Sequence, residues 1–165
     1  MRLRKLRPED APLMLEWMHD RDAVTHLRGN FAEKTLEDCE AFIAASEQNP
    51  EQLHLAIADE NDTYMGTVSL KHIDRQRGDA EFAIAIRRCA MGKGFSQFAM
   101  QQILLVGLQE LGLQTVFWCV SPENQRAVRF YDKGGYRKAE AVGLDAGRYY
   151  EPNQLKSLLW YRVDA

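Results

Sequence analysis

Short apolar runs, several of which alternate with polar residues, predict the strands of this chain. Polar or glycine-containing turns bound these runs, as is typical of strand ends. The segments that we expect to be strands are 3–6, 53–58, 64–73, 80–86, 115–120, 136–142 and 155–163. The polar turn at 59–62 makes the second and third of them a hairpin. In 80–86, Phe82 shares one face with two isoleucines, and Glu81 shares the other face with two alanines.

Apolar residues that recur every three or four positions, together with capping residues, predict the helices. We expect helices over 8–18, 36–46, 94–111 and 125–133. Thr35 stands where it can cap the second helix, and Asp38 completes a variant of the capping box. Gly112 stands where it can end the third. The segment between the first two helices, which includes 28–30, is expected to be a loop.

The order of these elements predicts an α+β fold. Helices and antiparallel strands come first, a strand–helix–strand–helix sequence follows, and two strands close the chain. A mixed, mostly antiparallel central sheet flanked by helices accommodates this order, with a parallel βαβ step over 80–120. The 165 residues suit a single domain, 1–165, because apolar residues make up 45% of them.

Charge and composition narrow the classes of function. The net charge of −3 provides no general attraction to nucleic acid or to anionic membranes, so neither is expected as a partner. The longest strongly apolar run, 103–108, is too short to span a bilayer, and no apolar segment follows the basic N-terminus, so we expect a cytoplasmic protein without a secretory signal. The three cysteines and four histidines show no metal-binding or disulfide spacing, and no metal site is predicted.

The loop between strand 80–86 and the long helix holds the first candidate chemistry. Gly92 and Gly94 allow positive φ angles and a close approach of a ligand to the main chain. The loop amides and the free amides of the first helical turn would together attract an anion, and Lys93 adds charge, so a diphosphate fits. Arg87 and Gly94 exclude a Walker A loop, and Gln97 excludes a dinucleotide fingerprint. The alternative is that the two glycines only make a tight turn.

The surrounding sequence resembles the signature of the GNAT N-acetyltransferase superfamily. The resemblance lies in 81–86 and 91–96, and again in 120–136 with its Asn…Ala-Val…Phe-Tyr…Gly-Tyr pattern. Met91 and Ser96 depart from the loop pattern of the family, although the ligand contacts there come mainly from backbone amides. The opening of the chain is similar to that of the RimJ/RimL-type branch, which acetylates ribosomal protein N-termini, polyamines and amino sugars.

The resemblance implies acetyl-CoA as the cosubstrate. In the family, the pantetheine arm pairs like an extra strand with the backbone at positions that correspond here to Ile84, Ala85 and Ile86. The residues that the resemblance assigns to the pyrophosphate are Met91, Gly92, Lys93, Gly94, Phe95, Ser96 and Gln97. Asn124 matches a cofactor-contacting asparagine, and its alternative role is to cap the helix that follows it.

The same resemblance suggests the catalytic residues. Tyr131 matches the general acid that protonates the departing thiolate, and its alternative role is a packing aromatic on an amphipathic helix. Glu81 is a candidate for the general base that deprotonates the amine. Its alternative is a charged strand end in solvent or a structural hydrogen bond. His72 and Glu16 are weaker candidates, and no acyl-enzyme on a cysteine is expected.

The acceptor side is expected in the first two helices and the loop between them. The residues predicted to bind the substrate are Trp17, His19, Asn30 and Phe31. Asp20 and Asp22 would attract a cationic amine or form a solvated acidic face, and Tyr149 and Tyr150 are expected to line the same cleft. The predicted function is direct acetyl transfer to a primary amine: a protein N-terminus, a polyamine or an amino sugar. The alternative is a non-catalytic module that binds coenzyme A. The resemblance also allows a homodimer.

Overall fold

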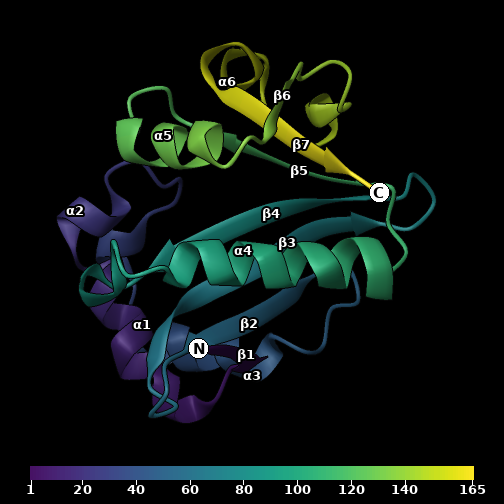
Figure 1. Cartoon of the computed structure of the whole chain (residues 1–165). Helices are drawn as coiled ribbons and strands as arrows, with labels where there is room; N and C mark the ends of the chain where they lie inside the picture. The colour runs from purple at the N-terminus through teal and green to yellow at the C-terminus, as the bar shows by residue number, and fades with distance from the viewer.

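A seven-stranded sheet runs through the molecule (Figure 1). The computed structural model describes all 165 residues. The strand order is β1-β2-β3-β4-β5-β7-β6, and only the β4–β5 pair is parallel. The strands are β1 (Arg2–Lys5), β2 (Leu53–Ala58), β3 (Tyr64–Asp74), β4 (Asp79–Ile86), β5 (Thr115–Val120), β6 (Arg137–Ala139) and β7 (Leu159–Asp164). The predicted α+β class, the hairpin and the parallel βαβ step are confirmed.

Six α-helices accompany the sheet. They are α1 (Ala11–Met18), α2 (Arg21–Val24), α3 (Leu36–Ala45), α4 (Phe95–Leu105), α5 (Gln125–Lys133) and α6 (Pro152–Ser157). A π-helical turn, Val106–Glu110, continues α4. The predicted capping box of α3 is confirmed: the Thr35 hydroxyl accepts a hydrogen bond from the Asp38 amide at 3.2 Å, and the Asp38 carboxylate accepts one from the Thr35 amide at 2.9 Å.

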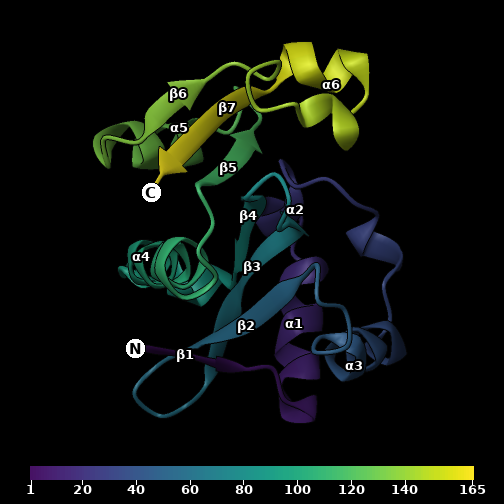
Figure 2. The ribbon, with the colours of Figure 1, turned by 90° about the vertical axis from the view of Figure 1, so that its right-hand side faces the viewer.

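The helices cover the two faces of the sheet differently. In Figure 2, α4 lies on one face of β1–β4, and α1 and α3 lie on the other. The main core, on the α4 side, includes Phe82, Ile103 and Val116, all of them buried. A smaller core under α1 and α3 includes Trp17 and Tyr64. None of the helices combines the length and the apolar character that crossing a bilayer would require.

Three predicted segments differ in the structure. The strand expected over 136–142 ends at Ala139, because the chain then turns back and buries Leu144 and Ala146 against Trp160. Residues 155–157, expected to be strand, belong to α6, which begins at a proline preceded by the capping residue Glu151. The loop expected between the first two helices contains α2 and the short 3-10 helix Phe31–Glu33.

Candidate active site

β4 and β5 diverge after a short stretch of pairing. The parallel ladder joins only 79–81 of β4 to 115–117 of β5. Beyond it, 82–86 has no strand partner on the β5 side, and Figure 2 shows β5 turning away from β4. The unpaired edge carries backbone N–H and C=O groups that need partners. An extended ligand can pair there as an added strand, which suits the predicted role of Ile84, Ala85 and Ile86.

A cavity of about 410 Å³ lies at this divergence. Its lining is mostly apolar, and it draws on both halves of the sheet. Residues 81–85 of β4 form one wall, and 118–120 of β5 form another. Thr67, Ser69 and Lys71 of β3 contribute polar groups, and α1 and α3 border the cavity as well. A pocket of this size and composition is typical of a small-molecule site with a few orienting polar groups.

The glycine loop presents a row of unpaired amides. Gly92 and Gly94 have φ angles of +74° and +87°, as the sequence predicts for a loop that needs positive φ. The N–H groups of residues 92 to 97 donate to no backbone acceptor, whereas the next amide in the chain, that of Phe98, bonds to the Gly94 carbonyl at 3.1 Å. Phe95 is buried and anchors the start of α4 in the core. Consecutive free amides at a helix N-terminus form an anion site.

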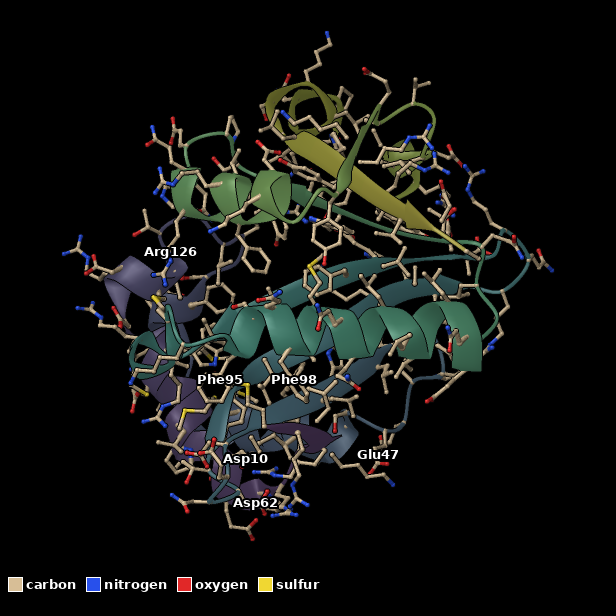
Figure 3. All side chains as sticks on the ribbon, viewed as in Figure 1. Asp10, Glu47, Asp62, Phe95, Phe98 and Arg126 are labelled. Atoms are coloured by element: carbon tan, nitrogen blue, oxygen red, sulfur yellow. The ribbon has the colours of Figure 1, made fainter.

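Arg126 adds positive charge at the loop, and sequence reasoning did not identify it. Its guanidinium contacts the Met91 sulfur and lies 3.9 Å from the position that a Cβ on Gly92 would occupy. Figure 3 shows Arg126 reaching from α5 toward the loop that precedes α4. Neither Arg126 nor Lys93 has a carboxylate within 4.0 Å. Both cations therefore remain available to an anionic ligand.

Asn124 takes up its capping role in the structure. Its Oδ1 accepts a hydrogen bond from the Ala127 amide at 3.2 Å and so caps α5. Asn124 does not line the cavity. Its side-chain amide nitrogen makes no hydrogen bond within the chain. The contact with the cofactor stays a prediction, and this nitrogen is the atom that would make it.

Tyr131 presents its hydroxyl to the cavity. The ring packs against both Trp118 and Tyr161, with centroid distances of 5.3 and 5.2 Å, and the residue is 7% exposed. The hydroxyl makes no hydrogen bond within the chain. The oxygen is not fully enclosed by protein, and because Tyr131 lines the cavity, the hydroxyl is open to it. Burial raises the pKa of Tyr131, and the nearby Cys119 thiol adds to the rise. The phenol therefore keeps its proton at neutral pH and can act as a proton donor.

Glu81 is buried in a polar cluster at the inner end of the cavity. It is 2% exposed, so the solvent-exposed strand end is excluded. Its Oε2 accepts a hydrogen bond from the Tyr150 hydroxyl and lies 3.9 Å from the Cys119 sulfur. Its Oε1 is buried without a hydrogen-bond partner. An unsatisfied carboxylate oxygen is costly in an interior, and the imidazole Nε2 of His72, 3.7 Å away, is positioned to offset this cost.

Three neighbours shape the environment of Glu81. Burial raises the pKa of Tyr150, and the nearby Cys119 and Glu81 add to the rise, so Tyr150 stays a donor toward the carboxylate. His72 lies next to Glu81, with its Nε2 3.7 Å from Oε1. Its ring stacks on that of Tyr149, with 3.9 Å between the ring centroids. His72 has a φ of +51° at the irregular end of the β3–β4 ladder and does not line the cavity. Tyr150 lines the cavity as predicted, and Tyr149 does not.

The four residues predicted to bind the acceptor fall into two groups. Trp17 and Phe31 line the cavity and pack edge to face at 5.3 Å, and the Trp17 indole donates to the Tyr64 hydroxyl at 2.9 Å. His19 and Asn30 are exposed and lie outside the cavity lining. The imidazole of His19 is bonded to the Lys34 carbonyl, and the amide of Asn30 donates to the Glu33 carboxylate at 2.7 Å.

The acidic residues near the acceptor side are neutralised by arginines. Arg88 forms ion pairs with Asp20 and Asp22, and the bond to Asp20 lowers the pKa of that carboxyl. Arg87 pairs with Glu16 at 2.9 and 3.1 Å. Asp20 and Asp22 are therefore paired with Arg88 and not free to attract a cationic amine, while Asp22 remains largely exposed, as expected for a solvated acidic face.

The cysteines are unpaired. Cys39 is buried, Cys89 is exposed, and Cys119 is half-buried beside Glu81 and Tyr150. Burial raises the pKa of Cys119, so the thiol is held in its protonated form. No group of three or more histidine, cysteine, aspartate or glutamate side chains is arranged to hold a metal ion.

The site thus combines an open strand edge, a loop with a row of free amides and a cavity that contains a protonated phenol. The model of the acetyltransferase (GNAT) domain family matches residues 1–137. The chain therefore belongs to the GNAT acetyltransferases, and it has their fold.

Relatives and solved structures agree with this membership. An uncharacterised N-acetyltransferase, p20, of Bacillus licheniformis is 24% identical over 139 residues, which cover 82% of this chain and 78% of the relative. The spermidine N-acetyltransferase of Vibrio cholerae in complex with CoA and spermine superposes with a TM-score of 0.78 at 19% identity, over 99% of this chain and 94% of that one. A dodecameric structure of the Vibrio cholerae enzyme superposes with a TM-score of 0.74 at 20% identity, over 99% and 92%.

Proposed function

We propose that residues 1–165 form one domain that transfers the acetyl group of acetyl-CoA directly to a primary amine. The observation that carries this proposal is the unpaired edge of β4, which runs from the cavity that contains Tyr131 and Glu81 toward the loop whose amides at 92–97 are unpaired. The amine is that of a small molecule or of a peptide. The spermine-bound relative supports an amine acceptor of small size.

Coenzyme A fits the residues of this site. The edge of β4 at Ile84, Ala85 and Ile86 would pair with the pantetheine arm, and the amides of 92–97 would hold the diphosphate, with Lys93 and Arg126 nearby. Bound acetyl-CoA supplies an acetyl group activated as a thioester. Side-chain departures at Met91 and Ser96 leave this fit intact, because backbone amides make the anion site.

Glu81 and Tyr131 divide the proton transfers in this proposal. An amine acceptor is protonated at neutral pH and must lose a proton before it attacks. The Glu81 carboxylate accepts that proton, directly or through a water; its Oε2 also accepts a hydrogen bond from Tyr150, and its Oε1 is buried beside His72. Tyr131 donates its phenolic proton to the departing sulfur, since burial keeps the phenol protonated. No covalent enzyme intermediate is needed.

Release of free thiol from acetyl-CoA over a panel of amines tests the proposal. The panel holds peptides, polyamines and amino sugars, which are the acceptors of the RimJ/RimL-type branch, and Glu81→Gln is measured beside the unsubstituted chain. We expect amine-dependent thiol release that falls about 100-fold or more in Glu81→Gln, as for the loss of a general base. Tight binding of coenzyme A without release for any amine would favour the non-catalytic binding module instead.

A further inference from the structure

Three unpaired cations line the acceptor side of the cavity. They are Arg28, Lys34 and Lys71. None of them has a carboxylate within 4.0 Å, although ion pairs are frequent elsewhere in the chain. The carboxylates that line the cavity are Asp38, whose Oδ2 accepts a hydrogen bond from the Thr35 amide in the cap of α3, and Glu81. The wall that faces the acceptor therefore carries more positive than negative charge.

Arg28 is held close to the proposed base. Its guanidinium carbon lies 4.0 Å from the centroid of the Tyr150 ring, in a cation–π arrangement. The hydroxyl of the same tyrosine donates to Glu81, so a single side chain separates the guanidinium from the carboxylate. None of the guanidinium N–H groups of Arg28 has an acceptor within the chain. A planar group with free, fixed donors is suited to bind a carboxylate or phosphate.

Lys71 approaches the same point from β3. It lies directly opposite Glu81 in the β3–β4 ladder, and its side chain is half-buried. Cross-strand partners project to the same face, yet the ammonium does not pair with Glu81, whose Oε1 has no partner. Burial raises the pKa of Cys119, and Arg28 and Lys71 both oppose that rise, so both cations act on the cluster around Glu81.

This distribution of charge is unfavourable for a polyamine. A polyamine adds several positive charges to a wall that already holds unpaired cations, and the acids that might receive it are paired with Arg87 and Arg88. Lys71 is half-buried without a partner, Arg28 is exposed with its guanidinium free, and an anion supplied by the ligand would pair with both.

We propose that the acceptor carries an anionic group, a carboxylate or a phosphate, a few bonds from its amine. Arg28 and Lys71 bind the anion, and Glu81 faces the amine. This inference rests on the proposed acetyl transfer and narrows its acceptor to amino acids, amino-sugar phosphates and related zwitterions. The proposed acceptor class differs from that of the spermidine acetyltransferases, with which this chain shares a fold.

Matched pairs of acceptors test the inference. Each α-amino acid is compared with its carboxamide, and glucosamine 6-phosphate is compared with glucosamine, with spermidine as the cationic reference. We expect kcat/KM to favour the anionic member of a pair by about ten- to a hundred-fold, the range of a charge-assisted hydrogen bond. The amino acid and sugar-phosphate pairs distinguish a carboxylate site from a phosphate site.

Substitutions at the cations complete the test. Arg28→Gln and Lys71→Gln should each reduce the preference for the anionic acceptor at least several-fold. The reduction should come from a higher KM for that acceptor, with the KM for acetyl-CoA unchanged. Arg75→Gln and Lys156→Gln are the matched controls, because these two residues are exposed, lie outside the cavity lining and have no ion pair, and they should keep the preference. Equal kcat/KM within every pair, or a preference for spermidine, would overturn the inference.

A binding measurement keeps the inference separate from the proposed transfer. Calorimetry of each pair in the presence of coenzyme A reports acceptor binding without turnover. Anion-selective binding that Arg28→Gln weakens at least several-fold supports the inference even if no thiol is released, in which case only the proposed transfer fails. Binding without a difference between the members of each pair, or no binding of any member, overturns it.

Discussion

Replacing Tyr131 by phenylalanine removes one oxygen atom from a packed aromatic cluster. The ring contacts with Trp118 and Tyr161 remain, and the hydroxyl makes no hydrogen bond that folding would lose. We therefore expect the free energy of unfolding to change by less than about 0.5 kcal/mol, as for a substitution that breaks no interaction. The change thus isolates the chemical role of the hydroxyl from its structural surroundings.

The catalytic effect of the same substitution should be large. General-acid catalysis contributes about 10²–10⁴ in rate, so kcat should fall by that factor, an increase of about 3 to 5 kcal/mol in the activation barrier. The KM for acetyl-CoA should stay within about twofold, since a group that acts mainly in the transition state contributes little to ground-state binding. A thiol-reactive chromophore measures release from acetyl-CoA, and urea unfolding measures stability.

Tyr161→Phe is the matched control in the same cluster. The Tyr161 hydroxyl donates to the Asp132 carboxylate at 2.8 Å, so its removal should cost about 1 kcal/mol of stability while leaving kcat unchanged. Tyr131→Phe should thus lower the rate and leave stability unchanged, whereas Tyr161→Phe should lower stability and leave the rate unchanged. Undiminished transfer by a correctly folded Tyr131→Phe chain would refute the assignment of Tyr131 as the acid.

Three further predictions follow from the structure. Gly94→Ala forces alanine into a φ of +87° beside the free amides, so the KM for acetyl-CoA should rise several-fold in steady-state kinetics while a variant of the exposed Arg75 shows no rise. Thr35→Ala removes the cap of α3 and should lower the free energy of unfolding in urea by about 1 kcal/mol, with transfer activity retained. Burial lowers the pKa of His54 in the folded chain, so the unfolded chain binds a proton on this imidazole more readily. The free energy of unfolding should therefore fall as the pH drops below about 6.5. Urea titrations of His54→Gln across this pH range should show a shallower fall.

Local sequence signals predicted much of the secondary structure and part of the site. The Thr35 cap, the β2–β3 hairpin and the positive φ angles of Gly92 and Gly94 depend on residues within a few positions of one another. Periodicity also separated the two faces of β4, with Phe82 in the main core and Glu81 on the other side. Such features need no knowledge of the remaining chain, because backbone sterics and short-range hydrogen bonds determine them.

The surroundings of each functional side chain depended on the tertiary structure. Glu81 meets Tyr150 across 69 residues, and Asp20 meets Arg88 across 68, so neither the polar cluster around Glu81 nor the pairing of Asp20 had a local signal. The length of the β4–β5 pairing and the position of Arg28 over Tyr150 likewise result from packing. The sequence by itself predicted most of the elements and the loop, and it suggested Tyr131 and Glu81 as candidates. Only the fold decided which charges are paired and which remain free for a ligand, because long-range packing brings those groups together.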